Sequence, residues 1–272
     1  TINKNTAIGT KAMYLNVNGD DNTAIGYQAL RTGTNGARNV AIGNNTLMNN
    51  TTGGDNIAVG MQSLHLNTTG NNNVAVGRNS LFSNTSGSDN SAFGMQSLQS
   101  NTGSSNTALG YLSLSNVTTG SNNVGIGNNA QVPDKANSNQ VRIGDTNITY
   151  AGIQVAWTTT SDERWKDNIQ PSNLGLSFIN QLKPVSYTRK NDVKKSVEYG
   201  FIAQELQASL QKFGVENAGI ISTDDNGMLG VRYNDLLAPM ILATQEQQKQ
   251  ILELQKLIIE MKKKLDSLND KF

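Results

Sequence analysis

The sequence has 272 residues, a formal net charge of +1 and no cysteine. A nearly neutral chain gives no electrostatic reason to expect nucleic acid or an anionic membrane surface as its main partner. The lack of cysteine excludes disulfides, thiolate catalysis and cysteine-based zinc sites.

The composition changes along the chain and indicates separate structural regions. The first part is rich in Asn, Gly, Thr and Ser, and no glutamate precedes Glu163. The tail from about Leu236 is rich in Gln, Glu, Lys, Leu and Ile. No apolar run reaches the roughly 18 residues of a membrane span, so no membrane insertion is expected. Because the chain begins at Thr1 and no signal peptide opens it, we expect a fragment of a longer protein.

A 17-residue repeat fills residues 1–144. Its pattern is Asn, any residue, Ala, an apolar residue and Gly, with full copies from Asn5–Gly9 to Asn106–Gly110 and degenerate copies ending at Gly127 and Gly144. Alternating small and apolar residues predict a short strand, and the Asn/Gly-rich stretches between them predict turns. One repeat therefore predicts strand, turn, strand, turn, which is one coil of a parallel β-solenoid.

A coil of this size buries few apolar atoms, so its stability has to come from stacking on its neighbours. A leucine follows most of the repeat glycines by four residues, as Leu64 follows Gly60. Equivalent asparagines of stacked coils are expected to form a hydrogen-bonded ladder. A disordered linker is the alternative, but disorder requires neither a phased apolar residue nor a phased leucine.

The repeats resemble the head repeats of trimeric adhesins and the shafts of phage tail fibres, which carry similar units of Ala, Ile or Val, and Gly. This resemblance implies a homotrimer. The Asn/Thr/Ser surface could bind a host glycan or receptor, although such surfaces are more often only solvated. His65 is the sole histidine, and we expect it in an exposed loop, with neither a metal nor a cofactor in the protein.

Residues 145–160 predict one or two strands that connect the repeats to the next region. Ser161 and Lys166 follow. A serine hydroxyl becomes a nucleophile when a base takes its proton, and a desolvated lysine can be that base. Their spacing alone does not identify a site, and a solvated turn remains the alternative.

The longer context of this pair resembles the opening signature of the endosialidase-type intramolecular chaperone peptidases. The residues that carry the resemblance are Ser161, Asp162, Arg164, Lys166 and Ile169. Three later segments resemble further parts of that family, in the family's order: 178–187, 199–206 and 231–240.

The resemblance implies a domain at the C-terminus of a phage tail spike, tail fibre or neck appendage, and thus a virion protein. Such a domain drives trimer assembly of the preceding β-structure and then cuts itself off. Carried over, the scissile bond is Thr160–Ser161, with Ser161 as nucleophile and Lys166 as general base. Asp162, Arg164 and Glu205 also match motif positions, where salt bridges or a helix cap are as reasonable as a chemical role. Cleavage would be intramolecular and happen once per chain.

The chaperone region itself, 161–235, predicts a small α+β domain. Helical spacing covers Leu174–Leu182 and Tyr199–Leu210. Gly219–Ser222 and Gly227–Tyr233 flank a turn and predict a β-hairpin.

The last region, 236–272, fits an unbroken heptad pattern and predicts a coiled coil. Its mix of Ile and Leu does not settle the number of helices, and the resemblances of the repeats and of the chaperone region imply three. A single helix packed on its own domain is the alternative. The a positions are Leu237, Thr244, Ile251, Ile258, Leu265 and Phe272, and the d positions are Met240, Gln247, Leu254, Met261 and Leu268.

Two other functions share these features. A bacterial trimeric adhesin would share the repeats, but it should end in a membrane anchor. A structural fibre could retain a chaperone domain that does not cleave.

Overall fold

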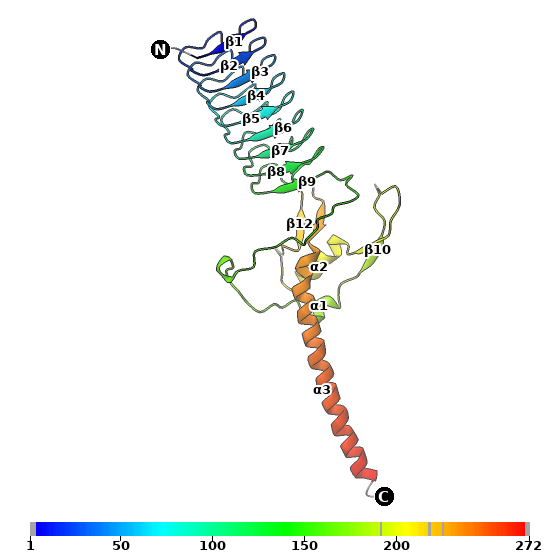
Figure 1. Ribbon diagram of the computed structural model, residues 1–272. Helices are drawn as coiled ribbons and strands as arrows, with labels where there is room; N and C mark the ends of the chain where they lie inside the picture. The colour runs from blue at the N-terminus through cyan, green and yellow to red at the C-terminus, as the bar shows by residue number, and fades with distance from the viewer. Residues whose placement is uncertain (1–3, 191, 217–218, 225, 270–272) are drawn as a thin grey trace. The chain divides into compact units, whose positions relative to one another are not determined.

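The computed structural model describes residues 4–190, 192–216, 219–224 and 226–269. The chain divides into two compact units, Thr1–Tyr150 and Ala151–Phe272. The first unit is the repeat region, and the second contains a small α+β region and a long helix (Figure 1).

The first unit is a parallel β-solenoid with a 17-residue repeat, as predicted (Figure 1). Strands that follow one another in the chain are neighbours in the sheet. The register pairs each central alanine with the next, as in Ala58 with Ala75. Within the described residues the strands of this sheet are β1 (Thr6–Ile8), β2 (Thr23–Ile25), β3 (Val40–Ile42), β4 (Ile57–Val59), β5 (Val74–Val76), β6 (Ser91–Phe93), β7 (Thr107–Leu109), β8 (Val124–Ile126) and β9 (Val141–Ile143).

The prediction of two strands per coil is wrong, because the leucine segment forms a turn. Gln62 and Leu64 have φ values of 57° and 50°, in the left-handed region that disfavours most side chains. The backbone N–H of Leu64 nevertheless donates to the carbonyl of Ser80 in the next coil, at 3.0 Å. Hydrogen bonding between coils therefore continues through the turn without an extended strand.

The core of the solenoid consists of small and medium apolar side chains stacked in columns. The central alanine of each strand and the leucine of each turn are fully buried at Ala24, Ala41, Ala58, Ala75, Ala92, Ala108, Leu30, Leu47, Leu64, Leu81, Leu98 and Leu114. The repeat glycine permits close stacking. Gly60 has a φ of 124°, and a Cβ there would lie 2.8 Å from the carbonyl carbon of Gly77.

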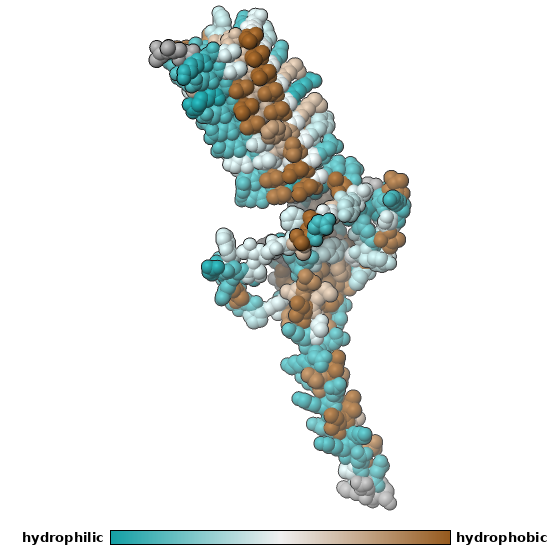
Figure 2. Space-filling model, in the orientation of Figure 1, coloured by the Kyte–Doolittle hydropathy of each residue, from teal (hydrophilic) through white to brown (hydrophobic). Residues whose placement is uncertain are grey.

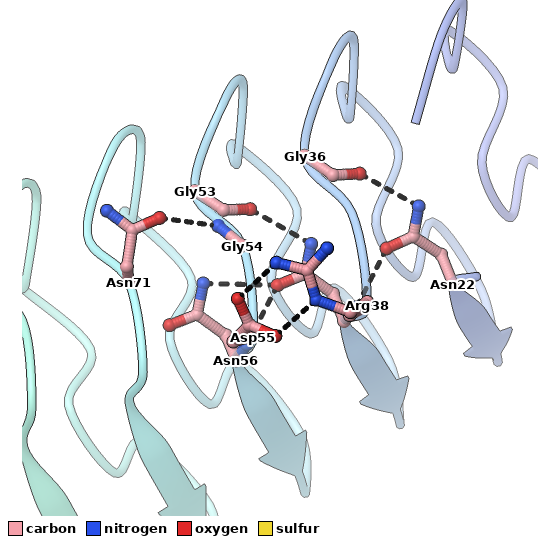
Figure 3. Close-up of polar contacts among 9 residues, drawn as sticks. Asn22, Gly36, Arg38, Gly53, Gly54, Asp55, Asn56 and Asn71 are labelled. Carbon is pink, nitrogen blue, oxygen red and sulfur yellow. Dashed lines mark hydrogen bonds and ion pairs between the residues drawn. The ribbon is translucent and has the colours of Figure 1, made fainter. Parts of the chain in front are cut away.

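The predicted asparagine ladder is present and runs through the interior. The side-chain amide of Asn22 donates to the carbonyl of Gly36 at 2.8 Å (Figure 3). Its Oδ1 accepts the backbone N–H of Asn39, also at 2.8 Å. Asn39 repeats both contacts with Gly53 and Asn56. Because both ends of each amide are bonded, these buried polar groups cost little.

His65 is half-buried rather than exposed, which corrects the prediction. Its Nδ1 lies 2.9 Å from the carbonyl oxygen of Asn45, and its ring stacks on Phe82 at a centroid distance of 5.2 Å. A structural role in the stack accounts for both contacts.

The second unit contains a small α+β region, as predicted. Its elements are α1 (Leu176–Ile179), β10 (Val185–Tyr187), β11 (Glu198–Gly200), α2 (Ala203–Lys212), β12 (Ile221–Thr223) and β13 (Leu229–Val231). β10 pairs antiparallel with β11, and β12 with β13, so the predicted hairpin is confirmed. Asp225, within the turn of that hairpin, lies outside the described residues. The core is formed by Leu174, Phe178, Leu206, Leu210, Ile220 and Leu236.

Three local predictions in this part of the chain need correction. No residue from 145 to 160 is in a strand, all of them being described. The helix expected over 174–182 is confined to α1, since Gly175 precedes it and Pro184 follows soon after. The helix expected from Tyr199 begins at Ala203, because Tyr199 pairs with Ser186 in the sheet.

The chain continues through a short 3-10 turn, Tyr233–Leu236, into the long helix α3 (Leu237–Asn269). Pro239 and Ala243 are its buried residues. Phe272, the last predicted a position, lies outside the described residues. Among the helices of the described residues, none is long and apolar enough to cross a membrane.

Candidate functional site

A short 3-10 turn, Glu163–Trp165, organises the residues around Ser161. Asp162 caps this turn by accepting the backbone N–H of Arg164 at 2.9 Å. The backbone N–H of Lys166 donates to the carbonyl of Glu163, also at 2.9 Å. Aspartate is favoured as an N-cap because its carboxylate satisfies an otherwise free N–H. The turn folds the chain back, so that the side chain of Lys166 reaches Ser161.

Lys166 and Ser161 form a direct hydrogen bond. The Nζ of Lys166 donates to the Oγ of Ser161 at 2.8 Å. Both residues are exposed, as is Thr160. An amine at this distance is within reach of the hydroxyl proton, and a neutral amine could take it as a general base.

Asp162 and Arg164 form a bidentate ion pair beside this contact. Nε and Nη2 of Arg164 lie 2.9 and 2.7 Å from the two carboxylate oxygens of Asp162. The hydrogen bonds from Arg164 lower the pKa of Asp162 below its ordinary value, and the same contact raises the pKa of Arg164. The pair therefore holds the shape of the turn while leaving Ser161 and Lys166 free to interact.

Glu205 lies apart from these four residues, in the first turn of α2. It lines an open cavity of about 450 Å³ together with Lys183, Ile202 and Lys212. Within the part of the chain that the structure describes, its carboxylate makes neither a hydrogen bond nor an ion pair. The structure thus brings together Ser161, Asp162, Arg164 and Lys166, and leaves Glu205 without a contact to them.

Two supporting contacts could not be read from the sequence. The hydroxyl of Tyr233 accepts the backbone N–H of Phe201 at 3.1 Å, and a Cβ on Gly200 would collide with that hydroxyl. The carboxylate of Glu246 accepts the N–H of Leu176 at 2.6 Å. In both cases the partners are far apart in the chain, so no local pattern marks them.

The family model described as chaperone of endosialidase matches residues 161–215. Comparisons with curated proteins and with solved structures gave no match. Domains of this family are typically self-cleaving, are typical of phage tail fibres and usually act in trimers. The chain therefore carries a chaperone of endosialidase domain at residues 161–215, and a β-solenoid precedes it.

Proposed function

We propose that this chain is the C-terminal part of a phage-type fibre precursor. Its chaperone domain drives three copies of the β-solenoid to assemble and then cuts the Thr160–Ser161 bond. The observation that carries this proposal is that the family match begins at Ser161, whose hydroxyl lies 2.8 Å from the amine of Lys166.

An apolar stripe on the solenoid supports assembly with further copies. The third residue of each strand is apolar and is either exposed or half-buried, and Figure 2 shows a hydrophobic band along the solenoid. A contiguous exposed band of this length marks an interaction surface. The stripe is formed by Ile8, Ile25, Ile42, Val59, Val76, Phe93, Leu109, Ile126 and Ile143.

A second apolar surface lies on α3. Positions c and g of the heptad make the contacts of α3 within its own chain. Pro239 and Ala243 are buried there, and Glu246 accepts the N–H of Leu176. The a and d side chains are left exposed, with Ile258 63% and Leu254 58% exposed. A single helix packed on its own domain would cover this stripe, so its exposure favours the coiled coil.

The proposed chemistry needs no substrate pocket, because the carbonyl of Thr160 adjoins Ser161. A neutral Lys166 amine takes the hydroxyl proton, and Oγ attacks the carbonyl carbon of Thr160. The C–N bond breaks, the proton passes to the new amine, and an ester joins Thr160 to Ser161. Water then hydrolyses the ester, which releases the domain. High effective molarity replaces substrate binding in such a reaction.

Assembly is the natural trigger for this step. Ser161 and Lys166 are exposed in the single chain, where water competes for both groups. Contact with neighbouring chains would exclude that water and favour a neutral amine. Cleavage would then follow trimer formation.

Mass spectrometry of the expressed full chain tests this proposal. We expect two products, one ending at Thr160 and one beginning at Ser161. Ser161→Ala and Lys166→Ala should each give one intact chain, whereas Ser172→Ala, at a nearby exposed serine, should cleave normally. A wild-type trimer that stays intact would instead favour a structural fibre that retains its chaperone domain. A stable wild-type monomer would contradict the assembly role.

A further inference from the structure

Trp165 has an aromatic side chain that stacks on no other ring among the residues that the structure describes. It is 82% exposed, and every residue from 151 to 173 is exposed as well. Yet its backbone is held in the capped turn beside Ser161 and Lys166. A large exposed aromatic on an ordered turn is typical of a contact surface.

The cavity beside α2 has the size and chemistry to receive an indole ring. Leu182, Phe201 and Leu206 line it, and its volume is about 450 Å³. Lys183 and Lys212 line it too, as does Glu205. Buried tryptophan needs an acceptor for its ring N–H, and a carboxylate in the wall can supply one.

Charges around the two surfaces are complementary. Glu163 and Asp167 flank Trp165 in the sequence and are exposed. Lys183 and Lys212 form no ion pair within the described residues, and neither does Glu163 or Asp167. Two unpaired acids beside a tryptophan match two unpaired lysines beside a cavity.

We propose that this cavity binds Trp165 of a second copy of this chain. Glu205 accepts the indole N–H, and Lys183 and Lys212 pair with Glu163 and Asp167 of that copy. The inference rests on the proposed trimer and assigns Trp165 a positioning role. Its docking places the Ser161–Lys166 contact against a neighbouring subunit, where water is excluded, and so couples assembly to cleavage.

Fluorescence of the uncut full chain tests the burial of Trp165. In a Ser161→Ala, Trp157→Phe background, Trp165 is the sole tryptophan. We expect a blue-shifted emission and several-fold weaker quenching by acrylamide in the trimer than in the denatured chain. Ala208→Glu, which puts a charge into the cavity, should restore quenching. Gln211→Glu makes the same charge change on α2 outside the cavity lining and should not.

Cross-linking distinguishes a neighbour's tryptophan from the chain's own. The natural chain has no cysteine, so two cysteines can be placed without background. A tagged chain with Asp167→Cys is coexpressed with an untagged chain carrying Lys212→Cys. A short bismaleimide should join the two chains, and Gln211→Cys in place of Lys212→Cys should join them far less.

Cleavage gives the third measurement, in chains that keep Ser161. Trp165→Ala and Ala208→Glu should slow release of the domain at least tenfold, while Trp157→Ala and Gln211→Glu should leave it near the wild-type rate. If the wild-type trimer cleaves while Trp165 remains open to acrylamide in the uncut Ser161→Ala trimer, the inference is overturned and the proposed function still stands. A chain that carries both Asp167→Cys and Lys212→Cys serves as a further control. If cross-links form only within that chain and not between the two singly substituted chains, the inference is likewise overturned and the proposed function still stands. A monomeric wild type would overturn both.

Discussion

The Asp162–Arg164 pair illustrates how a single exposed contact can shape the candidate site. Both side chains reach solvent, Arg164 more than Asp162, so the pair adds little to global stability. Its effect is local, since the same carboxylate also caps the turn that brings Lys166 to Ser161.

Acid should weaken this turn. The folded pKa of Asp162 is depressed, mainly by hydrogen bonds from Arg164. The pair's contribution is therefore present above the unfolded value, about 3.9, and is lost as the pH falls through the folded pKa. An NMR titration of the Ser161→Ala chain should give Asp162 a pKa below that ordinary value. Arg164→Gln should raise it, and an unchanged pKa would show that the ion pair does not form in solution.

Buried asparagines link neighbouring coils of the solenoid at the residue scale. Asn73 donates to the carbonyl of Gly87 at 2.9 Å and accepts the N–H of Asn90 at 3.0 Å. Asn73→Ala leaves the backbone N–H of Asn90 without its acceptor, at a cost of about 1–3 kcal/mol, whereas the carbonyl of Gly87 still accepts from the side-chain amide of Asn84 at 2.9 Å. Chemical denaturation monitored by circular dichroism should show the loss. Asn44→Ala, at an exposed repeat position, is the control, and an equal effect of both would mean that the ladder is not stabilising.

At the scale of elements, α1 depends on a residue of α3. A four-residue helix is too short to be stable alone. The carboxylate of Glu246 bonds the N–H of Leu176 at its start. Glu246 occupies heptad position c, which leaves the a and d positions of α3 for other contacts.

Glu246→Ala should loosen α1 without breaking α3. The lost charge-assisted hydrogen bond is comparable to a helix cap, about 0.5–2 kcal/mol. Hydrogen exchange of the full chain, followed by mass spectrometry, should become faster over Leu176–Ile179. Glu253→Ala, on the exposed part of the same helix, should leave that exchange unchanged. Equal protection in the Glu246 variant would mean that core packing through Phe178 holds α1 by itself.

Some of the secondary-structure elements could be predicted from the sequence and others could not. The solenoid and its asparagine ladder were predictable, because a nearly constant period stacks equivalent residues. The leucine turns were not, since alternating apolar residues usually indicate a strand, and only stacking makes a left-handed Leu64 tolerable. Tyr199 was assigned to a helix because its pairing with Ser186 is not a local property.

Only part of the candidate site could be predicted from the sequence. The contact of Lys166 with Ser161 lies within one turn, and the resemblance of the surrounding motif, rather than the spacing of the two residues, predicted it. The placing of Glu205 in the wall of a cavity depends on how α2 packs, which no local pattern encodes. Contacts between distant segments, such as that of Tyr233 with Phe201, cannot be predicted from local sequence patterns for the same reason.

At the scale of the whole molecule, two exposed apolar surfaces lie on separate units. One chain leaves the solenoid stripe and the a/d face of α3 uncovered. Both surfaces are long and narrow, and they have repeats of 17 and seven residues that a parallel copy of the same chain would match. The proposed assembly of identical chains in register would give each surface a partner of matching period.

The helix surface gives a matched test of this assembly. Ile258 occupies an a position and Ile259 the neighbouring b position, and they are 63% and 55% exposed in the single chain. Ile258→Lys would place a charge in the coiled-coil core, which is costly without a partner, whereas Ile259→Lys would remain in water. Sedimentation of the full chain should show a shift from trimer to monomer for Ile258→Lys alone, with slower cleavage at Thr160–Ser161. If both variants dissociate equally, α3 associates through another face, and if neither does, the solenoid rather than the helix holds the copies together.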